Sequence, residues 1–411
     1  MKNVILLTID ALRKDALGCY GNKGGLTPFI DSLQNGCLKF TNGQAIAPYT
    51  QASFPGILTS SYYLEYGKPK GLSPNRTLIS EPLKEAGIIT AAFHSNPYLS
   101  GFFGWDRGWD FFYDSIDEEV DEKIPYIRGN VINAKVAEWV SSHSRGGGYK
   151  PFFLWLHYMD IHEPYIPERK FVEMVDPSIT IGQDEMYSLF ENTLLKRDIS
   201  DPAKISILRR LYDIHVREVD TYVQEFFGTL EKLGILKDTV VIITSDHGDE
   251  FGEHGGLSHD DKMYSELIDI PLLIYDPAKD KGDICDTVVS NIDLPPTIMH
   301  LFGLEPVEAF VGHSLLPLSN YPGNGVFGEA IDQHSQRGGD IGKDIYFYRE
   351  GDLKIIHRAN RDGWEIYNLR EDPRELNNIV DTLPEAEKLK NKLRPRVRRW
   401  LSKQTRKETE K

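Results

Sequence analysis

The chain has 411 residues, of which 40% are apolar and 11% aromatic, and its formal net charge is −15. This length and composition can bury one large core and a smaller unit, so we expect a globular protein. The charge argues against a nucleic-acid surface, because phosphate neutralisation requires clustered lysine and arginine, and the basic cluster of this chain is confined to the tail "KLKNKLRPRVRRW". No segment is apolar over the ~20 residues that span a bilayer, so we expect no membrane anchor.

The cysteines and the N-terminus both favour a cytoplasmic location. Cys19, Cys37 and Cys285 cannot all pair and lack metal-ligand spacing, which favours packed thiols in a reducing compartment. The opening "MKNVILLTID" has only a short apolar run, and an acidic residue closes it without a small-residue cleavage site. We therefore expect the mature protein to begin at Met1. The sequence leaves the oligomeric state open.

Short apolar or β-branched runs alternate with amphipathic stretches over most of the chain. The runs expected to form strands are "NVILLTI" (3–9), "ITAAFH" (89–94), "PFFLWLHYM" (151–159), "TVVIITS" (239–245) and "IPLLIY" (270–275). The stretches expected to form helices are "LTPFIDSLQNG" (26–36), "RTLISEPLKEAG" (76–87) and the long segment 204–234. This alternation is typical of βαβ units, so we predict an α/β fold with a mostly parallel central sheet and helices on both faces.

The pattern changes from about residue 326. Four short runs, joined by turns such as "REGD" and "NRDG", precede the tail helix; they are "VFGEAI", "DIYFYREG", "LKIIHRA" and "WEIYNL". Such runs predict a small antiparallel sheet. We therefore expect a large α/β domain over residues 1–325 and a smaller α+β subdomain with a terminal helix over residues 326–411.

Polar residues follow two of the expected strands, one at each end of the chain. Asp10 closes the first strand, and Asp246 and His247 follow the strand at 239–245. Because parallel strands bring their carboxyl ends together, and ligands bind there in such sheets, the three side chains can meet. Carboxylate and imidazole ligands suit Mn²⁺, Mg²⁺, Ca²⁺ or Zn²⁺. The alternative is that each aspartate only caps a helix or closes a turn.

Eight segments resemble, in order, the successive blocks of the sulfatase family in the alkaline-phosphatase superfamily. They are "TIDALRKDALGCYG", "LTPFIDSLQNGCLKFTN", "FLWLHYMDIHEPYIP", "SDHGDEFGEHG", "KMYSELIDIPLLI", "NIDLPPTIMHLFGL", "GHSLLPL" and "EIYNLREDPRELNNI". The resemblance covers most of the chain. It implies a central sheet flanked by helices, a divalent metal, and a nucleophile on the turn that precedes a helix.

The resemblance places the nucleophile position on Thr50, when "ILTS" is matched with the family's "LLTG". Sulfatases carry Cys or Ser there in a CxPxR pattern and oxidise it to formylglycine, whereas this chain has Thr50, Ala52 and Phe54. Threonine cannot become formylglycine, and Thr50 is similar instead to the nucleophile of lipoteichoic acid synthases, phosphoethanolamine transferases and nucleotide pyrophosphatases. A metal lowers the pKa of a hydroxyl that it binds. We expect Thr50 to be both a metal ligand and the nucleophile, although it could also cap the helix that follows.

The resemblance also bears on the number of metal ions. Sulfatases usually have paired aspartates where this chain has Asp10 and Ala11, so one ligand is missing. The remaining ligands are Asp10, Thr50, Asp246 and His247. We expect one divalent ion there, and a second ion stays possible if Asp160, His162 and His259 form another cluster.

Further catalytic residues come from the same blocks. The family's HxPY pattern falls on His162, which implies contact with the sulfuryl or phosphoryl oxygens. Lys262 matches the substrate lysine of the family, and His259 could protonate the leaving oxygen. Donors of this kind stabilise the charge that spreads over the oxygens of a transferring group.

Three residues are expected to bind substrate. Arg13 matches the family's arginine beside the metal strand and could also orient a carboxylate ligand. The segment "FHSNPYLS" lies where sulfatases have a cluster of Lys and His, and here only His94 and Asn96 offer polar contact. His157 is expected to be a core residue or a support for the ligands.

The residues together predict a metal-dependent hydrolase that cleaves a small anionic ester through a covalent Thr50 intermediate. Family membership favours sulfate esters. A threonine sulfate must be cleaved by water, which is easier for a phosphoryl adduct, so the chemistry favours phosphate and the transferred group stays open. The alternatives are a phosphotransferase or phosphodiesterase of the same superfamily, and a non-catalytic metal-binding paralogue.

Overall fold

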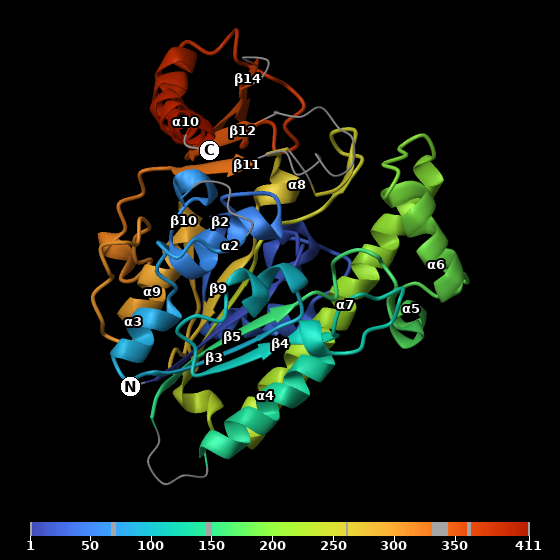
Figure 1. The fold of residues 1–411 in the computed structure, drawn as a ribbon. Helices are drawn as coiled ribbons and strands as arrows, with labels where there is room; N and C mark the ends of the chain where they lie inside the picture. The colour runs from blue at the N-terminus through green and yellow to red at the C-terminus, as the bar shows by residue number, and fades with distance from the viewer. Residues whose placement is uncertain are drawn as a thin grey trace.

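The computed structural model describes residues 2–66, 71–144, 150–259, 262–330, 344–359 and 363–409. These residues form an eight-stranded sheet, a four-stranded sheet and a two-stranded hairpin. Figure 1 shows the large sheet in the middle of the molecule, between layers of helices, and the small sheet at the top. The predicted fold class, a central sheet flanked by helices plus a small antiparallel sheet with a terminal helix, is confirmed.

The strands of the large sheet are mostly parallel. They are β1 (Asn3–Ile9), β2 (Cys37–Gln44), β3 (Ile89–His94), β4 (Phe111–Asp114), β5 (Phe152–Tyr158), β6 (Thr239–Ser245), β9 (Leu272–Tyr275) and β10 (Asp283–Ser290). Their order is β10-β2-β9-β6-β1-β5-β3-β4. Only β9 runs antiparallel to its neighbours β2 and β6. The central position of β1 puts its carboxyl end between those of β5 and β6.

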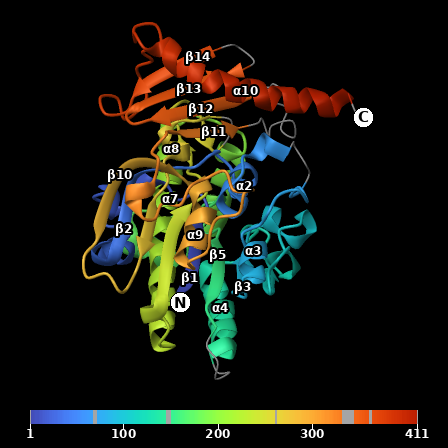
Figure 2. The same cartoon turned by 90° about the vertical axis from the view of Figure 1, so that its left-hand side faces the viewer.

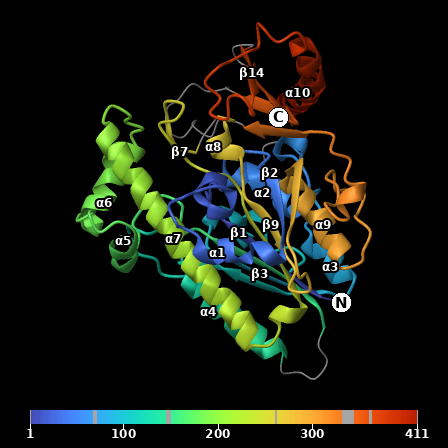
Figure 3. The same ribbon diagram turned by 180° about the vertical axis from the view of Figure 1, so that it is seen from behind.

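Two layers of helices cover the sheet. One layer contains α1 (Pro28–Ser32), α4 (Gly129–Ser144) and α7 (Pro202–Lys232), with α5 (Arg169–Val175) and α6 (Gln183–Leu189) beside α7 (Figure 3). The other contains α2 (Thr50–Thr59), α3 (Ser80–Glu85) and α9 (Leu294–Leu301) (Figure 2).

Alternation along β1 explains why both faces of the sheet are covered. Ile5 and Leu7 belong to the core shared with α4 and α7, whereas Val4 and Leu6 belong to the core shared with α2, α3 and α9. Because successive side chains of a strand point to opposite faces, a continuous apolar strand must be buried on both. This arrangement leaves the ends of the central strands as the place for polar side chains.

The small sheet follows in the order β11 (Val326–Ala330), β12 (Ile345–Glu350), β13 (Leu353–Arg358) and β14 (Gly363–Asn368), all antiparallel. Alternate residues face opposite ways here too. Tyr346 and Tyr348 pack with the tail helix α10 (Ala386–Thr409), while Phe347 packs with Tyr49 and Met263 of the large unit. The inner face of the small sheet therefore shares a buried cluster with the residue that precedes Thr50.

The basic tail forms α10 and packs on the chain's own second sheet. Leu389 and Leu393 are buried in the cluster that contains Tyr346. The guanidinium of Arg396 lies over the rings of Tyr62 and Phe327. Over the described ranges, α10 and the other helices are too short or too polar to cross a membrane.

Candidate metal centre and active site

The carboxyl ends of β1 and β6 bring the predicted ligands together. The two strands pair in parallel with Ile9 opposite Ser245, so the residues that follow them, Asp10 and Asp246, leave the sheet side by side. His247 comes next, and ligand atoms of Asp10, Asp246 and His247 all lie within 4.8 Å of one another. All three side chains are fully buried.

Helix α2 adds Thr50 to this group. The helix begins at Thr50 with Tyr49 in the N-cap position, so Thr50 is the first helical residue and not the cap. Its Oγ1 lies 3.4 Å from Asp10 Oδ2 and 3.4 Å from His247 Nε2. We name the four residues the strand-end cluster; they are Asp10, Thr50, Asp246 and His247.

Two hydrogen bonds fix the orientation of the cluster. His247 Nδ1 lies 3.0 Å from the carbonyl oxygen of Gly248, which is the geometry of an N–H donor and leaves Nε2 free to accept. Ser53, one turn after Thr50, donates to the carbonyl oxygen of Asp246 at 2.7 Å. Helix α2 is therefore tied to the loop that carries Asp246 and His247.

Unpartnered oxygens mark the centre of the cluster. Within the described residues, Asp10 Oδ1 and Asp246 Oδ2 have no hydrogen-bond partner. His247 Nε2 lies 3.6 Å from the first and 3.5 Å from the second. A buried carboxylate without a partner is costly. Oxygen and imidazole donors at this spacing fit a divalent cation, which would neutralise both carboxylates.

The pKa values of the two aspartates move in opposite directions. Burial, together with the charge of Asp10, raises the pKa of Asp246. Burial also acts to raise the pKa of Asp10, but the charges of His162 and His247 and a hydrogen bond from His157 hold it well below its usual range. Asp10 therefore stays ionised to a lower pH than Asp246.

Two further side chains hold Asp10 in place. Asn96 Nδ2 donates to Asp10 Oδ2 at 3.0 Å and lies 3.5 Å from Thr50 Oγ1. His157 Nε2 lies 3.3 Å from the same carboxylate oxygen, and its Nδ1 is 2.9 Å from Thr8 Oγ1. Asn96 thus joins the cluster, and His157 supports it from the core, as its position after an apolar run suggested.

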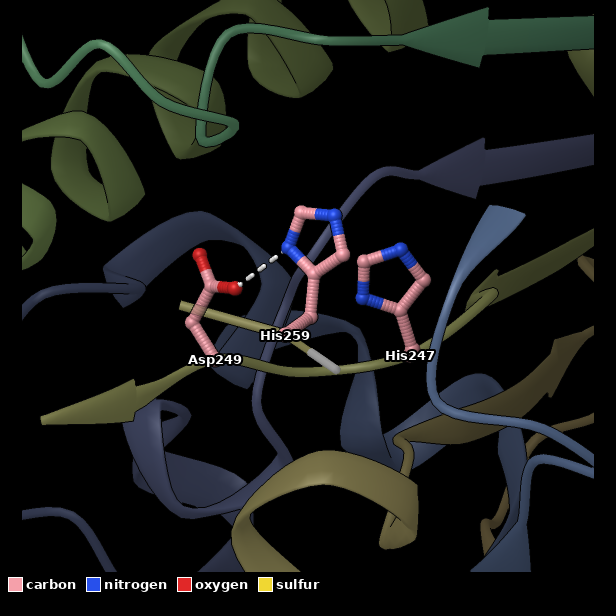
Figure 4. Close-up of side chains that lie close together, drawn as sticks. All are labelled: His247, Asp249 and His259. Carbon is pink, nitrogen blue, oxygen red and sulfur yellow. Dashed lines mark hydrogen bonds and ion pairs between the residues drawn. The ribbon is translucent and has the colours of Figure 1, made fainter. Parts of the chain in front are cut away.

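His259 and His162 lie next to the cluster. The ring centroid of His259 is 4.5 Å from that of His247 and 5.0 Å from that of His162. Asp249 orients His259 through Oδ1, which is 2.9 Å from its Nδ1, and accepts from Tyr165 through Oδ2 at 2.6 Å. Figure 4 shows the His259 ring between Asp249 and His247.

Asp249 is a residue that the sequence analysis missed. It stands two residues after His247 in "SDHGDEFGEHG", just before the hairpin of β7 (Glu250–Phe251) and β8 (Leu257–Ser258). With His247 and His259 it forms a second group of ligand atoms within 4.8 Å of one another. Since only Nε2 of His247 is free, the two groups share one nitrogen.

The second metal set considered from sequence is not assembled as expected. Both carboxylate oxygens of Asp160 accept from the backbone N–H of Gly129 at the start of α4, at 3.1 and 2.9 Å. Burial and the nearby Glu218 raise the pKa of Asp160 to about 7. Asp160 is therefore committed to the helix, and Asp249 takes the place beside His259.

Two predicted site residues are engaged elsewhere. Lys262 Nζ forms an ion pair with Glu250 Oε2 at 2.7 Å and donates to the carbonyl oxygen of His254 at 3.0 Å. The ring of His94 stacks on Trp155 in the core. The partners of each lie outside the strand-end cluster, so the structure does not bring either side chain to it.

Arg13 contacts the loop that carries Asp249. Its guanidinium binds Asp15 and Glu253, each at 2.7 Å, and donates to the carbonyl oxygen of Asp249 at 2.8 Å. The carbonyl contact anchors the loop that presents Asp249. The side chain thus supports the loop that carries Asp249, and its charge is already paired with Asp15 and Glu253; its expected roles towards substrate or a metal-binding carboxylate stay predictions.

A cavity of about 170 Å³ opens beside Thr50. Its lining is Tyr49, Thr50, Gln51, Asn96, Pro97, Tyr98, Pro125, Tyr126, Met159, His162, Glu163 and His259. Four of the predicted catalytic or substrate-binding residues are among them. Within the described residues, the lining contains no lysine or arginine.

Comparison with known families identifies two matching regions. The family model described as Sulfatase matches residues 2–304. A second, described as N-sulphoglucosamine sulphohydrolase, C-terminal, matches residues 252–403. The first match alone covers more than half of the chain and contains every residue of the strand-end cluster.

Individual proteins are similar over nearly the whole chain. An N-acetylglucosamine-6-O-sulfatase of Bacteroides thetaiotaomicron is 23% identical, over 94% of this chain and 84% of its own. An arylsulfatase of Clostridium perfringens is also 23% identical, over 92% of this chain and 90% of its own.

Solved structures agree with the fold. One, in complex with its substrate D-glucosamine-2-N,6-O-disulfate, has a TM-score of 0.80 at 21% identity and covers 98% of both chains. The phosphonate monoester hydrolase of Agrobacterium radiobacter has a TM-score of 0.75 at 19% identity, covering 99% of this chain and 96% of its own. At these identities the likeness establishes the fold.

Proposed function

Because the chain belongs to the sulfatase family and is thereby a hydrolase of ester bonds, we propose that it cleaves sulfate or phosphate esters with Thr50 as the nucleophile. The observation that carries the proposal is the position of Thr50 Oγ1, 3.4 Å from both Asp10 Oδ2 and His247 Nε2. The unpartnered oxygens of Asp10 and Asp246 support a cation beside that hydroxyl.

Members of the family generally bind a divalent metal, and the residues that would hold it here are Asp10, Thr50, Asp246 and His247. When bound, such an ion supplies positive charge that lowers the pKa of a neighbouring hydroxyl and stabilises an anionic ester. One ion is the simpler proposal, since His247 offers a single free nitrogen to both ligand groups.

The chain's own residues have distinct tasks in this proposal. Thr50 donates to Asp10 Oδ2, and this hydrogen bond holds its hydroxyl in position. Asn96 and His162 line the cavity and offer N–H donors to the oxygens of the transferring group.

Burial lowers the pKa of His162, but the charges of Asp10, Glu163 and Asp249 raise it above its usual value, which favours the protonated donor.

His259 is proposed to give a proton to the leaving oxygen. It lines the same cavity, and Asp249 holds its Nδ1 at 2.9 Å, which leaves Nε2 for the substrate. After the alcohol leaves, the same imidazole can remove a proton from the water that cleaves the Thr50 ester. Asp249 acts as a positioning residue.

The transferred group is proposed to be phosphoryl in preference to sulfuryl. A threonine ester has no neighbouring hydroxyl that could expel the anion, so water must attack the adduct, and phosphoryl adducts yield to water more readily. The similarity of fold to a phosphonate monoester hydrolase supports this preference, while the family match favours sulfate.

The proposal is tested with wild type, Thr50→Ala and Thr50→Ser in the presence of Mn²⁺. Substrates are p-nitrophenyl sulfate, p-nitrophenyl phosphate and bis-p-nitrophenyl phosphate. We expect Thr50→Ala to lose on the order of 10³-fold or more of turnover, and Thr50→Ser to keep part of it because the hydroxyl remains. Thermal unfolding serves as the control for folding.

Each outcome has a clear reading. Undiminished turnover by Thr50→Ala rejects the nucleophile. Turnover of bis-p-nitrophenyl phosphate above the monoesters identifies a phosphodiesterase. A wild-type protein that binds Mn²⁺ but cleaves none of the three esters is a non-catalytic metal-binding paralogue.

A further inference from the structure

The cavity beside Thr50 has a composition that a purely anionic substrate does not explain. Its catalytic wall is formed by Thr50, Asn96, His162 and His259. Apart from Gln51 and Glu163, the rest of its lining is aromatic or apolar, with Tyr98 and Tyr126 among the larger side chains. Within the described residues, its one carboxylate is that of Glu163.

The carboxylate of Glu163 is buried, and although its charge acts on His162, no ion pair or hydrogen bond joins its side chain within the described residues. The residue is 8% exposed, and its Oε2 has no hydrogen-bond partner within the described residues. Its backbone carbonyl accepts from Nδ1 of His162 at 2.7 Å, but that bond leaves the side chain untouched. An ionised carboxylate in such a place is costly unless a cation or donor joins it.

Other buried carboxylates in this part of the molecule have charged or hydrogen-bonding neighbours. Glu218 lies 2.7 Å from Arg128 through Oε1 and 3.1 Å from His215 Nδ1 through Oε2, and Asp249 accepts from both His259 and Tyr165. The strand-end cluster accounts for the unpartnered oxygens of the remaining aspartates, because a divalent cation fits them. Glu163 lies outside that cluster and needs a different partner.

We propose that Glu163 binds an ammonium group on the alcohol part of the substrate, so that the protein selects esters of amino alcohols or aminoaryl alcohols. This inference rests on the proposed function of the same cavity. The anionic end of such a substrate meets Thr50, Asn96 and His162, and its cationic end meets Glu163.

Charge and surroundings favour an ammonium over a hydroxyl group. A hydroxyl would give Glu163 one hydrogen bond but no ion pair at a buried position. An ammonium neutralises the charge, and Tyr98 and Tyr126, whose ring type can stabilise a cation, line the same cavity. A substrate with both charges would also complement a cavity that offers no lysine or arginine among its described residues.

The test compares two esters that differ in one charge. They are 4-(2-aminoethyl)phenyl phosphate, which carries an ammonium, and 4-ethylphenyl phosphate, which does not, with the corresponding sulfates in parallel. For wild type with Mn²⁺ we expect kcat/KM for the ammonium ester to exceed that for the neutral ester by about tenfold. In Glu163→Gln the ratio should fall to about one, whatever loss the two esters share through the weaker charge beside His162.

A matched control removes a carboxylate outside the cavity. Glu168 lies five residues further along and accepts from Tyr222 at 2.6 Å, so Glu168→Gln should keep the wild-type ratio. If Glu163→Gln lowers kcat/KM for both esters equally, the carboxylate only supports His162 and the inference is overturned. An unchanged ratio overturns it as well.

Binding separates this inference from the proposed function. Calorimetry of both phosphates with Mn²⁺-loaded Thr50→Ala needs no turnover, and we expect the ammonium ester to bind about tenfold more tightly. The double variant Thr50→Ala/Glu163→Gln should lose that preference. If wild type cleaves neither ester but the binding preference depends on Glu163, the proposed function fails and the inference stands.

Discussion

Two sets of residues with buried carboxylates lie near the same edge of the large sheet. They differ in whether each carboxylate oxygen has a hydrogen-bond or ionic partner. In the strand-end cluster, Asp10 and Asp246 face each other, and each has an oxygen without a partner among the described residues. In the second group, which we name the paired network, every carboxylate oxygen of Asp269 has a partner. The partners are Lys14 at 2.7 Å, Gln44 at 2.7 Å and Arg349 at 3.3 Å.

The pKa shifts express the same difference. Burial raises the pKa of Asp246, and the charge of Asp10 adds to this. Burial also acts to raise the pKa of Asp269, but the charges of Lys14 and Arg349 hold it far below its usual range. One residue type is thus destabilised as an anion in one place and stabilised in the other.

The size of the neighbouring cavities does not reveal which group is functional. The cavity that includes Lys14 and Asp269 in its lining is about 490 Å³, against about 170 Å³ beside Thr50. Several of the charges around the larger one are already paired within the chain, among them those of Arg13, Lys14 and Asp269. The volume of a cavity therefore does not by itself mark the catalytic site.

The largest effect is expected from Asp246→Asn. The amide keeps the acceptor that now receives the backbone N–H of Ala11 and His247 but removes the negative charge. We expect turnover to fall on the order of 10³-fold and the rise of Tm on adding Mn²⁺ to disappear. The metal-free protein should unfold no earlier than wild type, because one of two repelling anions is gone. An unaltered Mn²⁺ response would remove Asp246 from the metal site.

Asp269→Asn makes the same chemical change in the paired network and serves as the counterpart. It leaves Lys14 and Arg349 without their anion, so we expect unfolding free energy to drop by about 3 kcal/mol. The Mn²⁺ response and the turnover of the folded fraction should be retained. Denaturant unfolding and assays on the same samples measure both; a loss of turnover like that of Asp246→Asn would contradict the separation of the two groups.

The smallest effect concerns a buried group that is neutral. Burial lowers the pKa of His94 from 6.5 to about 4, although the nearby Asp114 acts to raise it and His157 to lower it. Between these pH values His94 binds a proton in the unfolded chain but not in the folded protein. The contribution of neutral His94 to the free energy of unfolding is therefore complete above pH 6.5 and is lost as the pH falls below that value.

His94→Gln should remove that dependence. Between pH 7 and pH 5.5 wild type should lose about 1 kcal/mol relative to the variant. Turnover at neutral pH should change less than about threefold, because the ring stacks on Trp155 and lies outside the lining of the catalytic cavity. A large fall in turnover would indicate that His94 contributes to substrate binding.

The sequence predicted the central strands well, because β1, β3, β5 and β6 are continuous apolar runs that only a sheet buried on both faces can use. It missed β2 and β10, whose "CLKFTNGQ" and "DICDTVVS" mix polar and apolar residues, with β10 at the edge of the sheet. It also gave no sign that β9 runs antiparallel, since direction depends on the path of the connecting segments.

Within the site, the sequence predicted which side chains meet at the strand ends. It did not predict the directions of the other side chains. The convergence of Asp10, Asp246 and His247 follows from parallel pairing alone. Lys262 pairs with Glu250, and His94 stacks on Trp155. The local sequence around Lys262 and His94 does not predict these partners. The division at residue 326 stays a prediction, although the second sheet begins at Val326.

The pairing of β1 with β6 has a consequence for how the protein matures. The backbone N–H of Ala11 reaches Asp246 Oδ1 across 235 positions of the chain, and such long-range contacts form slowly during folding. On the ribosome, Asp10 emerges early but must wait for the second half of translation before its neighbours exist. Two acidic side chains are then brought together late, and a cation that fits between them would favour this last step of folding.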